Sequence, residues 1–288
     1  MDLTRSISNS FSRAAHAYDQ FAEVQSYSAH VCGQRIQEML PSLPSGPILE
    51  IGCGTGFLTQ QLVQYARDRQ LVAADISAEM LDICRFNIEN QFGVLADLTF
   101  EQIDGQLLAS ERKFALIAAS FSFQWFTDLK VSLGRLLNSL LPGGVIVFCC
   151  PTRESFGEWR DACRKTNREF SGNLLPDTES FKTFAADYGC EFNSYELDYV
   201  LRFDSPLDFF KSLRSTGANA RMKETSSSGN PLIPVVRAWE RERHPALVTY
   251  RVLFGTLRTS SRTSHGLVQN SAGNEPVCTA RTTSSSGL

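Results

Sequence analysis

The segment ILEIGCGTGFLTQQL, residues 48–62, constrains the fold of this chain more than any other stretch. It begins as a short apolar run typical of a buried strand, places glycines at Gly52, Gly54 and Gly56, and continues with apolar residues at helical spacing. Glycines between a strand and a helix let the backbone touch a ligand and point the helix N-terminus toward it. The segment therefore predicts an α/β fold with a nucleotide-like ligand at this turn.

Strands and helices alternate through the first half of the sequence. Apolar runs predict strands at 47–52, 70–77, 98–105, 113–126 and 144–150, and periodicity predicts helices at 57–67, 78–90 and 129–141. This alternation is typical of a parallel sheet with right-handed crossovers, which binds ligands at the carboxyl ends of its strands. Asp75, Asp104 and Ser120 lie at such ends, as the glycine turn does, so four strand ends point to one site.

The second half predicts more helices, two strands and a polar tail. Helices are expected at 154–170, 177–189, 205–218 and 234–243, strands at 194–203 and 246–258, and a polar loop at 220–230. From 259 to 288 the composition shifts to Ser, Thr, Gly and Asn, which favours disorder. We therefore expect one domain over residues 1–258 and a disordered tail.

Composition argues against several classes of protein. The formal net charge is -3 and the pI is about 5.9, so no global field would gather nucleic acid. The sequence has no run of about 18 apolar residues that would span a membrane, and its first residues are too polar for a secretory signal. The eight cysteines form no CxxC pair, so they read as reduced thiols. We expect a cytoplasmic protein without a metal, membrane or nucleic-acid partner.

The glycine spacing differs from the dinucleotide fingerprint. In G-x-G-x-x-G the third glycine falls one residue later than Gly56 does here, and Glu50 precedes Gly52. The pattern E-x-G-x-G-x-G resembles motif I of class I S-adenosylmethionine-dependent methyltransferases. The resemblance implies a Rossmann-like class I methyltransferase fold, with a mostly parallel seven-stranded sheet flanked by helices, and S-adenosylmethionine as the cofactor.

The same resemblance assigns the cofactor contacts. Asp75 ends a strand, where a carboxylate can accept both ribose hydroxyls. Glu50 would lie near the methionine amino group. The residues implied for adenine are Asp104 and Gly105 at its amine and Ile76 and Met80 on its faces. Simple core packing is an equal alternative for Met80.

Further segments narrow the resemblance to one family. In order along the chain they are SFSRAAHAYDQFAEVQ at 10–25, SFSFQWF at 120–126, SLRSTGAN at 212–219 and VTYRVLFGTLR at 248–258. Together with the glycine motif they resemble the malonyl-[acyl-carrier protein] O-methyltransferases of biotin synthesis over residues 11–258. Ser120 departs from the asparagine usual in that family, in the wall beside the transferred methyl.

That resemblance implies a reaction and a layout. The reaction would esterify the free carboxylate of a malonyl thioester, on acyl carrier protein or coenzyme A. The parts would be a helical lid at 11–40, a cofactor-binding core at 46–150, and substrate-side helices, including a helical insertion, with the last strands at 151–258. A carboxylate is ionised at pH 7 because its pKa is about 4, so no general base is needed. Catalysis then depends on in-line placement and exclusion of water.

Tyr18 and Arg214 are the candidates for holding the substrate carboxylate. Tyr18 lies in the segment that the resemblance places as a lid over the cofactor, and Arg214 lies in SLRSTGA. Lid packing is an equal alternative for Tyr18, and a solvated helix charge is one for Arg214.

Arginines recur every four residues at Arg160, Arg164 and Arg168, with Lys165 beside them, as along one face of a helix. Carrier proteins are acidic as a class, so this stripe is a candidate docking surface for the malonyl-loaded acyl carrier protein. A solvated helix face is the alternative interpretation.

Two other functions stay open. In the first, the protein is a methyltransferase whose methyl acceptor is another small acid or a quinone-like ring. A ring needs an aromatic slot, which the 20 phenylalanines allow. Alternatively, the protein binds the cofactor without catalysis and serves as an assembly partner. The early third glycine disfavours a nicotinamide dehydrogenase.

Overall fold

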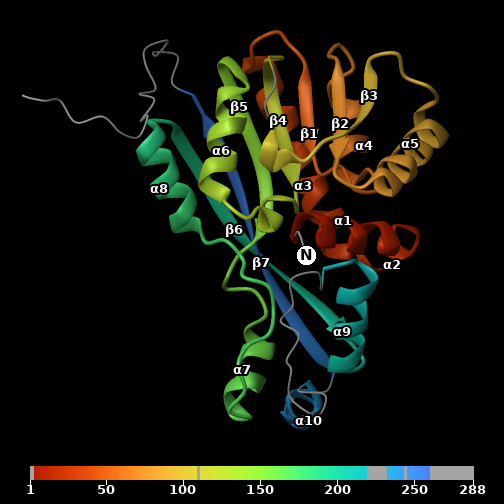
Figure 1. Cartoon of the computed structure of the whole chain (residues 1–288), viewed down its shortest axis with the longest axis vertical. Helices are drawn as coiled ribbons and strands as arrows, with labels where there is room; N and C mark the ends of the chain where they lie inside the picture. The colour runs from red at the N-terminus through yellow and green to blue at the C-terminus, as the bar shows by residue number, and fades with distance from the viewer. Residues whose placement is uncertain (1–2, 109–110, 219–231, 243–244, 260–288) are drawn as a thin grey trace, which may run out of the picture.

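A seven-stranded sheet forms the centre of the molecule (Figure 1). The computed structural model describes residues 3–108, 111–218, 232–242 and 245–259. The strands of the sheet are β1 (Ile48–Ile51), β2 (Leu71–Asp75), β3 (Leu98–Gln102), β4 (Phe114–Ser120), β5 (Leu140–Pro151), β6 (Glu191–Phe203) and β7 (Ala246–Arg258). The order is β3-β2-β1-β4-β5-β7-β6. The first five strands are parallel, and β7 is antiparallel to both neighbours. The predicted mostly parallel sheet is confirmed.

Helices cover both faces of this sheet. They are α1 (Leu3–Ala14), α2 (Tyr18–Phe21), α3 (Glu23–Met39), α4 (Phe57–Tyr65), α5 (Ala78–Phe92), α6 (Leu129–Asn138), α7 (Gly157–Lys165), α8 (Thr178–Tyr188), α9 (Pro206–Ser215) and α10 (Leu232–Glu242). The cluster of buried side chains that includes α3 and α4 lies on one face, and the cluster that includes α6 and α8 lies on the other.

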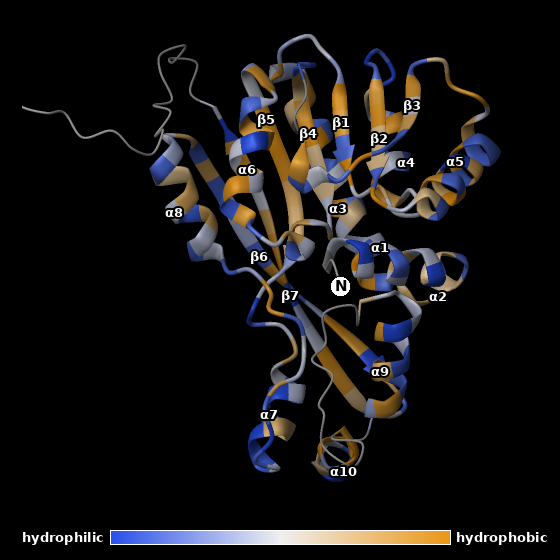
Figure 2. Cartoon of the chain, viewed as in Figure 1, coloured by the Kyte–Doolittle hydropathy of each residue, from blue (hydrophilic) through white to orange (hydrophobic). Residues whose placement is uncertain are grey.

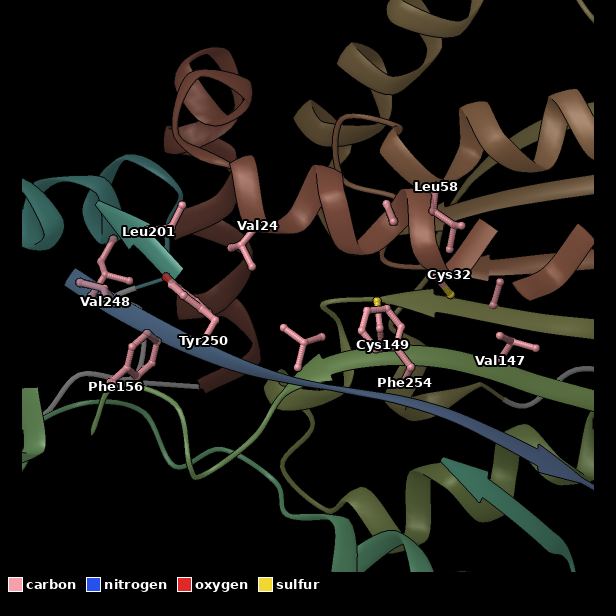
Figure 3. Close-up of a cluster of buried hydrophobic side chains, with 14 of the residues drawn as sticks. Val24, Cys32, Leu58, Val147, Cys149, Phe156, Leu201, Val248, Tyr250 and Phe254 are labelled. Carbon is pink, nitrogen blue, oxygen red and sulfur yellow. The ribbon is translucent and has the colours of Figure 1, made fainter. Parts of the chain in front are cut away.

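Alternate residues of the central strands enter these two cores. Leu116 and Ala118 of β4 belong to the core under α3 and α4, whereas Ile117 and Ala119 belong to the core under α6 and α8. Figure 3 shows part of the first core, where Cys32 of α3 lies close to β5. Because both faces are covered, the central strands are largely hydrophobic, as β4 and β5 are in Figure 2. That hydrophobicity is why apolar runs identified them.

The order of the strands positions the glycine turn. β1 lies between β2 and β4, so the chain crosses from one side of β1 to the other as the sheet is built. In such sheets the crossover connections leave in opposite directions and open a crevice at the carboxyl end of the strand. The turn after β1 lies at this crevice.

β6 and β7 form a long antiparallel extension of the sheet. They pair from Glu191 with Arg258 to Phe203 with Ala246. Figure 1 shows α7, α9 and α10 at the far end of this extension, with α1 and α2 between that end and β1 and β2. Aromatic side chains of the three helices pack together there, including Trp159, Phe209 and Trp239. This end of the extension is the helical insertion.

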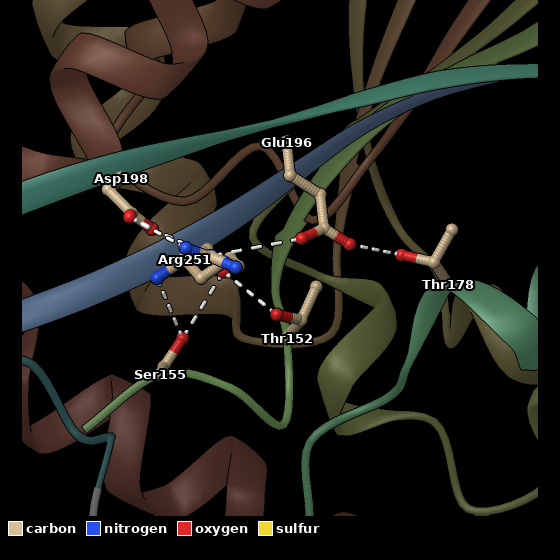
Figure 4. A network of polar contacts seen from close by, with 6 residues as sticks. All are labelled: Thr152, Ser155, Thr178, Glu196, Asp198 and Arg251. Carbon is tan, nitrogen blue, oxygen red and sulfur yellow. Dashed lines mark hydrogen bonds and ion pairs between the residues drawn. The ribbon is translucent and has the colours of Figure 1, made fainter. Parts of the chain in front are cut away.

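Arg251 of β7 fastens the segment after β5 to the extension (Figure 4). Its guanidinium donates to both carboxylate oxygens of Asp198, each at 2.7 Å. Its backbone N–H donates to Ser155 Oγ at 3.1 Å, and Thr152 Oγ1 donates to its carbonyl at 3.3 Å. The ion pair is exposed and contributes little free energy, so the backbone hydrogen bonds are what positions residues 152–155.

Several predicted boundaries are wrong. The helix expected at 129–141 ends at Asn138 because Leu140 already pairs with Phe114, so the Pro-Gly-Gly sequence at 142–144 lies inside β5. The strand expected at 113–126 ends at Ser120, and Phe123–Trp125 form a short 3-10 helix. The predicted loop at 220–230 and the tail, apart from Thr259, lie outside the described residues.

Among the residues that the structure describes, no helix has the length and hydrophobicity needed to cross a bilayer.

Candidate functional site

The glycine turn is held by backbone hydrogen bonds and by Ser122. Gly52 has a φ of 71°, and its N–H donates to the Ala74 carbonyl at 2.7 Å. Ser122 Oγ donates to the Ile51 carbonyl at 2.9 Å, and a Cβ on Gly52 would lie 2.2 Å from that oxygen. Both the backbone conformation and the approach of Ser122 therefore require glycine at this position.

The other two glycines have different surroundings. A Cβ on Gly54 would meet nothing within 4 Å, whereas one on Gly56 would lie 3.1 Å from Cys84 Sγ on α5. Gly56 precedes α4 with a φ of 106°, and it is absent from the lining of the cavity described below. The third glycine thus lets the turn pack closely against a helix, and its contact with the cofactor stays a prediction.

Asp75 at the end of β2 organises the turn from the neighbouring strand. Its Oδ2 accepts the Gly54 N–H and its Oδ1 accepts the Ser77 N–H, each at 2.9 Å. Burial raises the pKa of this carboxyl, and the backbone hydrogen bonds oppose that rise. The carboxylate is thus built into the turn while it also lines the adjoining cavity.

Glu50 of β1 is buried beneath the turn. Its Oε2 accepts a hydrogen bond from Thr59 Oγ1 of α4 at 2.7 Å. Burial is the largest cause of a pKa raised to about 8, which the Thr59 hydrogen bond opposes and the nearby Asp75 reinforces. A cation bound beside Glu50 would lower this pKa and favour the charged carboxylate.

A cavity that is partly open to solvent lies against the turn and the ends of β1, β2, β3 and β4, and it spans about 890 Å³ with the open solvent included. We call it the first cavity. The predicted cofactor-binding residues that line it are Glu50, Gly52, Gly54, Asp75, Ile76, Met80, Asp104, Gly105 and Ser120. Residues from four separate strand ends thus meet at one place, as their positions in the sequence predict.

The charges around the first cavity are of one sign. Its acidic lining residues in the described ranges are Glu50, Asp75 and Asp104, and no Lys, Arg or His lines it there. Such a wall disfavours a pyrophosphate and favours a cationic ligand. It fits the sulfonium and ammonium groups of S-adenosylmethionine better than a nicotinamide dinucleotide. Within the described chain, no group of three or more His, Cys, Asp or Glu side chains is arranged to hold a metal ion.

The N-terminal helices form a lid over the first cavity. The residues of α1 that line it are Thr4, Ile7 and Phe11. Ser12 Oγ donates to Glu79 Oε2 at 2.5 Å, and Thr55 Oγ1 donates to Asp19 Oδ1 at 2.6 Å. Hydrogen bonds therefore hold the lid both to the start of α5 and to the glycine turn. The first helix of this segment, α1, begins at Leu3.

A second cavity adjoins the first on the side of α7 and α9, and it spans about 590 Å³ with open solvent included. The residues that line both cavities are Phe11, Tyr18, Gln25, Phe121 and Trp125. Most other residues of the second cavity are aromatic or aliphatic, and none of those described is charged. An acidic-walled cavity thus opens onto an uncharged one.

Tyr18 and Phe121 lie at the junction of the two cavities. Burial, followed by the charges of Asp75 and Asp19, raises the pKa of Tyr18, so its hydroxyl stays protonated and able to donate. Phe121 has a φ of 52°, and its N–H donates to the Cys149 carbonyl at 2.8 Å. A bulky residue in this left-handed region is strained, and such strain clusters at functional sites.

Arg214 lies outside both cavities. It is exposed in the last turn of α9, whereas its neighbours Leu213 and Thr216 line the second cavity. The helix therefore places Arg214 on its solvent side, and a role for it at the substrate carboxylate stays a prediction.

The predicted stripe of arginines does not form on one helix face. α7 ends at Lys165, so Arg168 lies beyond it. The Arg160 guanidinium lies over the Phe170 ring, 3.8 Å from its centroid. Only Arg164 and Arg168 of the three arginines are exposed.

Sequence reasoning missed most residues at the junction. Phe11, Gln25 and Trp125 belong to the segments that carried the family resemblance. Those segments identified the family, but they did not indicate which of their residues line the cavities. The backbone conformation of Phe121 has no comparable signal, because the contacts of β4 and β5 impose it.

Known proteins resemble this chain over most of its length. A family model described as a methyltransferase domain matches residues 48–144. A malonyl-[acyl-carrier protein] O-methyltransferase of Magnetococcus marinus is 30% identical over 252 residues, covering 86% of this chain and 90% of the relative. One of Bacillus cytotoxicus is 26% identical over 279 residues, covering 93% and 96%. The biotin biosynthesis bifunctional protein BioCD of Bordetella avium is 30% identical over 257 residues, covering 88% of this chain and 52% of that protein.

Solved structures share the fold. The YcgJ protein from Bacillus subtilis superposes with a TM-score of 0.57 at 12% identity, covering 80% of this chain and 99% of that chain. The structure of the DhpI–SAM–HEP complex gives a TM-score of 0.55 at 16% identity, covering 89% and 98%. At these identities the likeness concerns the fold alone.

Proposed function

Because this chain belongs to the malonyl-[acyl-carrier protein] O-methyltransferase family, we propose that it transfers the methyl group of S-adenosylmethionine to the free carboxylate of a malonyl thioester in biotin synthesis. The fold is that of a class I methyltransferase. The observation that carries the proposal is the pair of adjoining cavities. The acidic one suits a cationic cofactor, and the uncharged one suits an acyl group on a long arm.

The residues of the first cavity support binding of this cofactor, which supplies an electrophilic sulfonium methyl when bound. The residues that we assign to its adenosine part are Asp75 for the ribose and Ile76, Met80, Asp104 and Gly105 for adenine. Those assigned to its methionine part are Glu50, Gly52 and Gly54. Ser120 would form the wall beside the methyl, where its Oγ lies 3.3 Å from Cys149 Sγ.

Affinity for the cofactor is expected to rise with pH toward about 8, the pKa of buried Glu50. Below that pH, a proton must leave Glu50 before its carboxylate can pair with an ammonium group. One released proton gives about a tenfold gain per pH unit. Calorimetry with S-adenosylhomocysteine, which carries the same amino-acid part, measures this slope.

Two controls isolate Glu50 in that measurement. Methylthioadenosine lacks the amino-acid part, and Glu50→Gln lacks the titrating group, so neither combination should show the slope. A slope that persists in Glu50→Gln would remove Glu50 from this role.

The second cavity supports a mechanism based on positioning. The malonyl carboxylate is ionised at pH 7 because its pKa is about 4, so no residue has to act as a base. A lysine or arginine there would hold electron density on the attacking oxygen, and none of the described lining residues is charged. Tyr18 would donate a single hydrogen bond to the carboxylate oxygen that does not attack. The lid would exclude water.

Replacing Tyr18 with phenylalanine is expected to lower kcat/KM for a malonyl thioester by about 10- to 100-fold, the usual effect of losing a hydrogen bond to a charged group. Affinity for S-adenosylhomocysteine should stay within about twofold, because the ring still packs near Phe57, at 6.4 Å between centroids. Tyr27→Phe, at an exposed tyrosine of α3, is the matched control. Unchanged turnover in Tyr18→Phe would exclude this tyrosine from the substrate site.

We take the malonyl-loaded acyl carrier protein as the substrate partner. Asn173 lines the second cavity, and its neighbour Leu174 is 90% exposed. Arg164 and Arg168, on the same stretch of chain, are exposed as well. Arg164 pairs with Asp161, and Arg168 is followed by the exposed Glu169. Two exposed arginines on the stretch of chain that leads to the exposed leucine beside the cavity still offer contacts for an acidic carrier protein. Arg160, which lies over an aromatic ring, would support this surface from beneath.

Charge reversal at Arg164 and Arg168 to glutamate is expected to raise KM for the malonyl-carrier protein about tenfold, because like charges then face each other. KM for malonyl-pantetheine, which lacks the protein and its phosphate, should not change. Lys182→Glu, at an exposed lysine of α8, is the control for a general charge effect. Equal rises in KM for both substrates would contradict docking at this surface.

The reaction is tested by intact-mass measurement. Incubation with S-adenosylmethionine should add one methyl group to malonyl-carrier protein and none to acetyl-carrier protein, which has no free carboxylate. Cofactor binding without methyl transfer would instead support an assembly partner. Methylation of another small acid or ring, with the malonyl thioester untouched, would support a different acceptor.

A further inference from the structure

The wall of the second cavity contains a buried acceptor that no described residue satisfies. Asn173 Nδ2 donates to the Ala218 carbonyl at 2.8 Å, which fixes the orientation of the side-chain amide. Its Oδ1 is buried and has no hydrogen-bond partner in the described part of the chain. Because an unsatisfied buried acceptor is unfavourable, this atom points to a ligand that brings a donor.

A second acceptor of this kind lies on the wall that the two cavities share. Gln25 Oε1 is also buried without a partner among the described residues, and Gln25 lines both cavities. The remaining wall is uncharged and mostly apolar. The chemistry of this cavity therefore matches an uncharged ligand that is largely apolar and carries N–H donors.

The position of Asn173 is fixed by its neighbours on the chain. A Cβ on the preceding Gly172 would lie 2.4 Å from Phe170 and 3.0 Å from Trp159, so the chain there packs directly on two rings. The following residue, Leu174, points to solvent. Asn173 is thus held in place before any ligand arrives, as a binding residue should be.

We propose that the second cavity seats the arm of the thioester substrate, and that Asn173 Oδ1 accepts the N–H of an amide in that arm. The inference rests on the proposed function, because a malonyl thioester of pantetheine has two amides between the sulfur and the far end of its arm. The malonyl group itself has no N–H to offer. Asn173 would therefore recognise the carrier of the acyl group and leave the carboxylate to residues nearer the cofactor.

The test compares malonyl-pantetheine with two analogues in which one or the other amide N–H is replaced by an ester oxygen. In the unmodified protein, one analogue is expected to lose about 10- to 100-fold in kcat/KM, since its oxygen then faces Asn173 Oδ1. In Asn173→Leu, the amide and ester substrates should perform equally, which is the signature of a direct pairwise contact. Calorimetric binding of malonyl-pantetheine and the two analogues, with S-adenosylhomocysteine in place of the methyl donor so that no transfer occurs, should give the same pattern.

A second variant separates recognition from support of the fold. Asn173→Asp loses the donor to Ala218 and keeps an acceptor, so it should retain the difference between amide and ester substrates. Two results would overturn the inference. One is that Asn173→Leu lowers kcat/KM by the same factor for the amide and the ester substrates, so that the difference between them persists. The other is that the unmodified protein shows no difference between them. If the unmodified protein methylates no malonyl thioester at all, the proposed function itself fails, which is a distinguishable result.

Discussion

Replacing Asp75 with alanine is expected to weaken cofactor binding by about 100-fold or more, close to 2.7 kcal/mol. The substitution removes the carboxylate assigned to the ribose and also leaves the N–H groups of Gly54 and Ser77 without their acceptor. The turn would then lose its fixed conformation as well as its ligand contact. Calorimetry with S-adenosylhomocysteine measures the loss.

Two comparisons make the Asp75 result specific. Asp82→Ala removes an exposed carboxylate from nearby α5 and should leave the affinity unchanged. Thermal unfolding of Asp75→Ala without ligand shows whether the protein is still folded. Binding within about threefold of the unmodified protein would mean that Asp75 serves the turn alone.

Gly52→Ala is expected to destabilise the fold by about 2 to 5 kcal/mol, from overpacking and from left-handed strain together. A Cβ there would lie 2.2 Å from Ser122 Oγ, in a residue whose φ is 71°. Ser122 cannot move away without giving up its hydrogen bond to the Ile51 carbonyl. Chemical denaturation measures the change in the free energy of unfolding.

Gly54→Ala is the matched control for this prediction. Its φ of 54° is also left-handed, but a Cβ there would meet nothing within 4 Å, so only the conformational cost of about 1 to 2 kcal/mol remains. Adding Ser122→Gly to Gly52→Ala should recover the part that is due to collision. Equal losses for the two single glycine variants would show that conformation alone accounts for the requirement at Gly52.

The cofactor side of the site was largely predictable from the sequence. Glu50, Asp75 and Asp104 lie at or just beyond strand ends, and in a parallel sheet strand ends gather at one edge. Gly56 does not line the first cavity, and glycine serves close packing as readily as it serves a ligand. Spacing alone does not distinguish those two uses.

The substrate side was much less predictable. Tyr18 was the first candidate for the substrate carboxylate and Arg214 the second, and of these two only Tyr18 lines the cavities. The difference depends on which side of α9 faces the β6–β7 extension and on how the lid folds back over β1. Both are set by contacts between segments far apart in the chain. The type of a residue at one position does not reveal these contacts.

The sequence by itself determined the class of fold, the cofactor chemistry and the family, because these follow from local periodicity, from the ends of strands and from short motifs. Only the tertiary structure decided that the acidic cavity opens onto an uncharged one and that Phe121 adopts a left-handed conformation at their junction. It also decided that Asn173, in the wall of the second cavity, has a buried Oδ1 with no partner among the described residues. Burial, charge environment and hydrogen-bond satisfaction are properties of packed neighbours. They depend on contacts between segments that are far apart in the sequence.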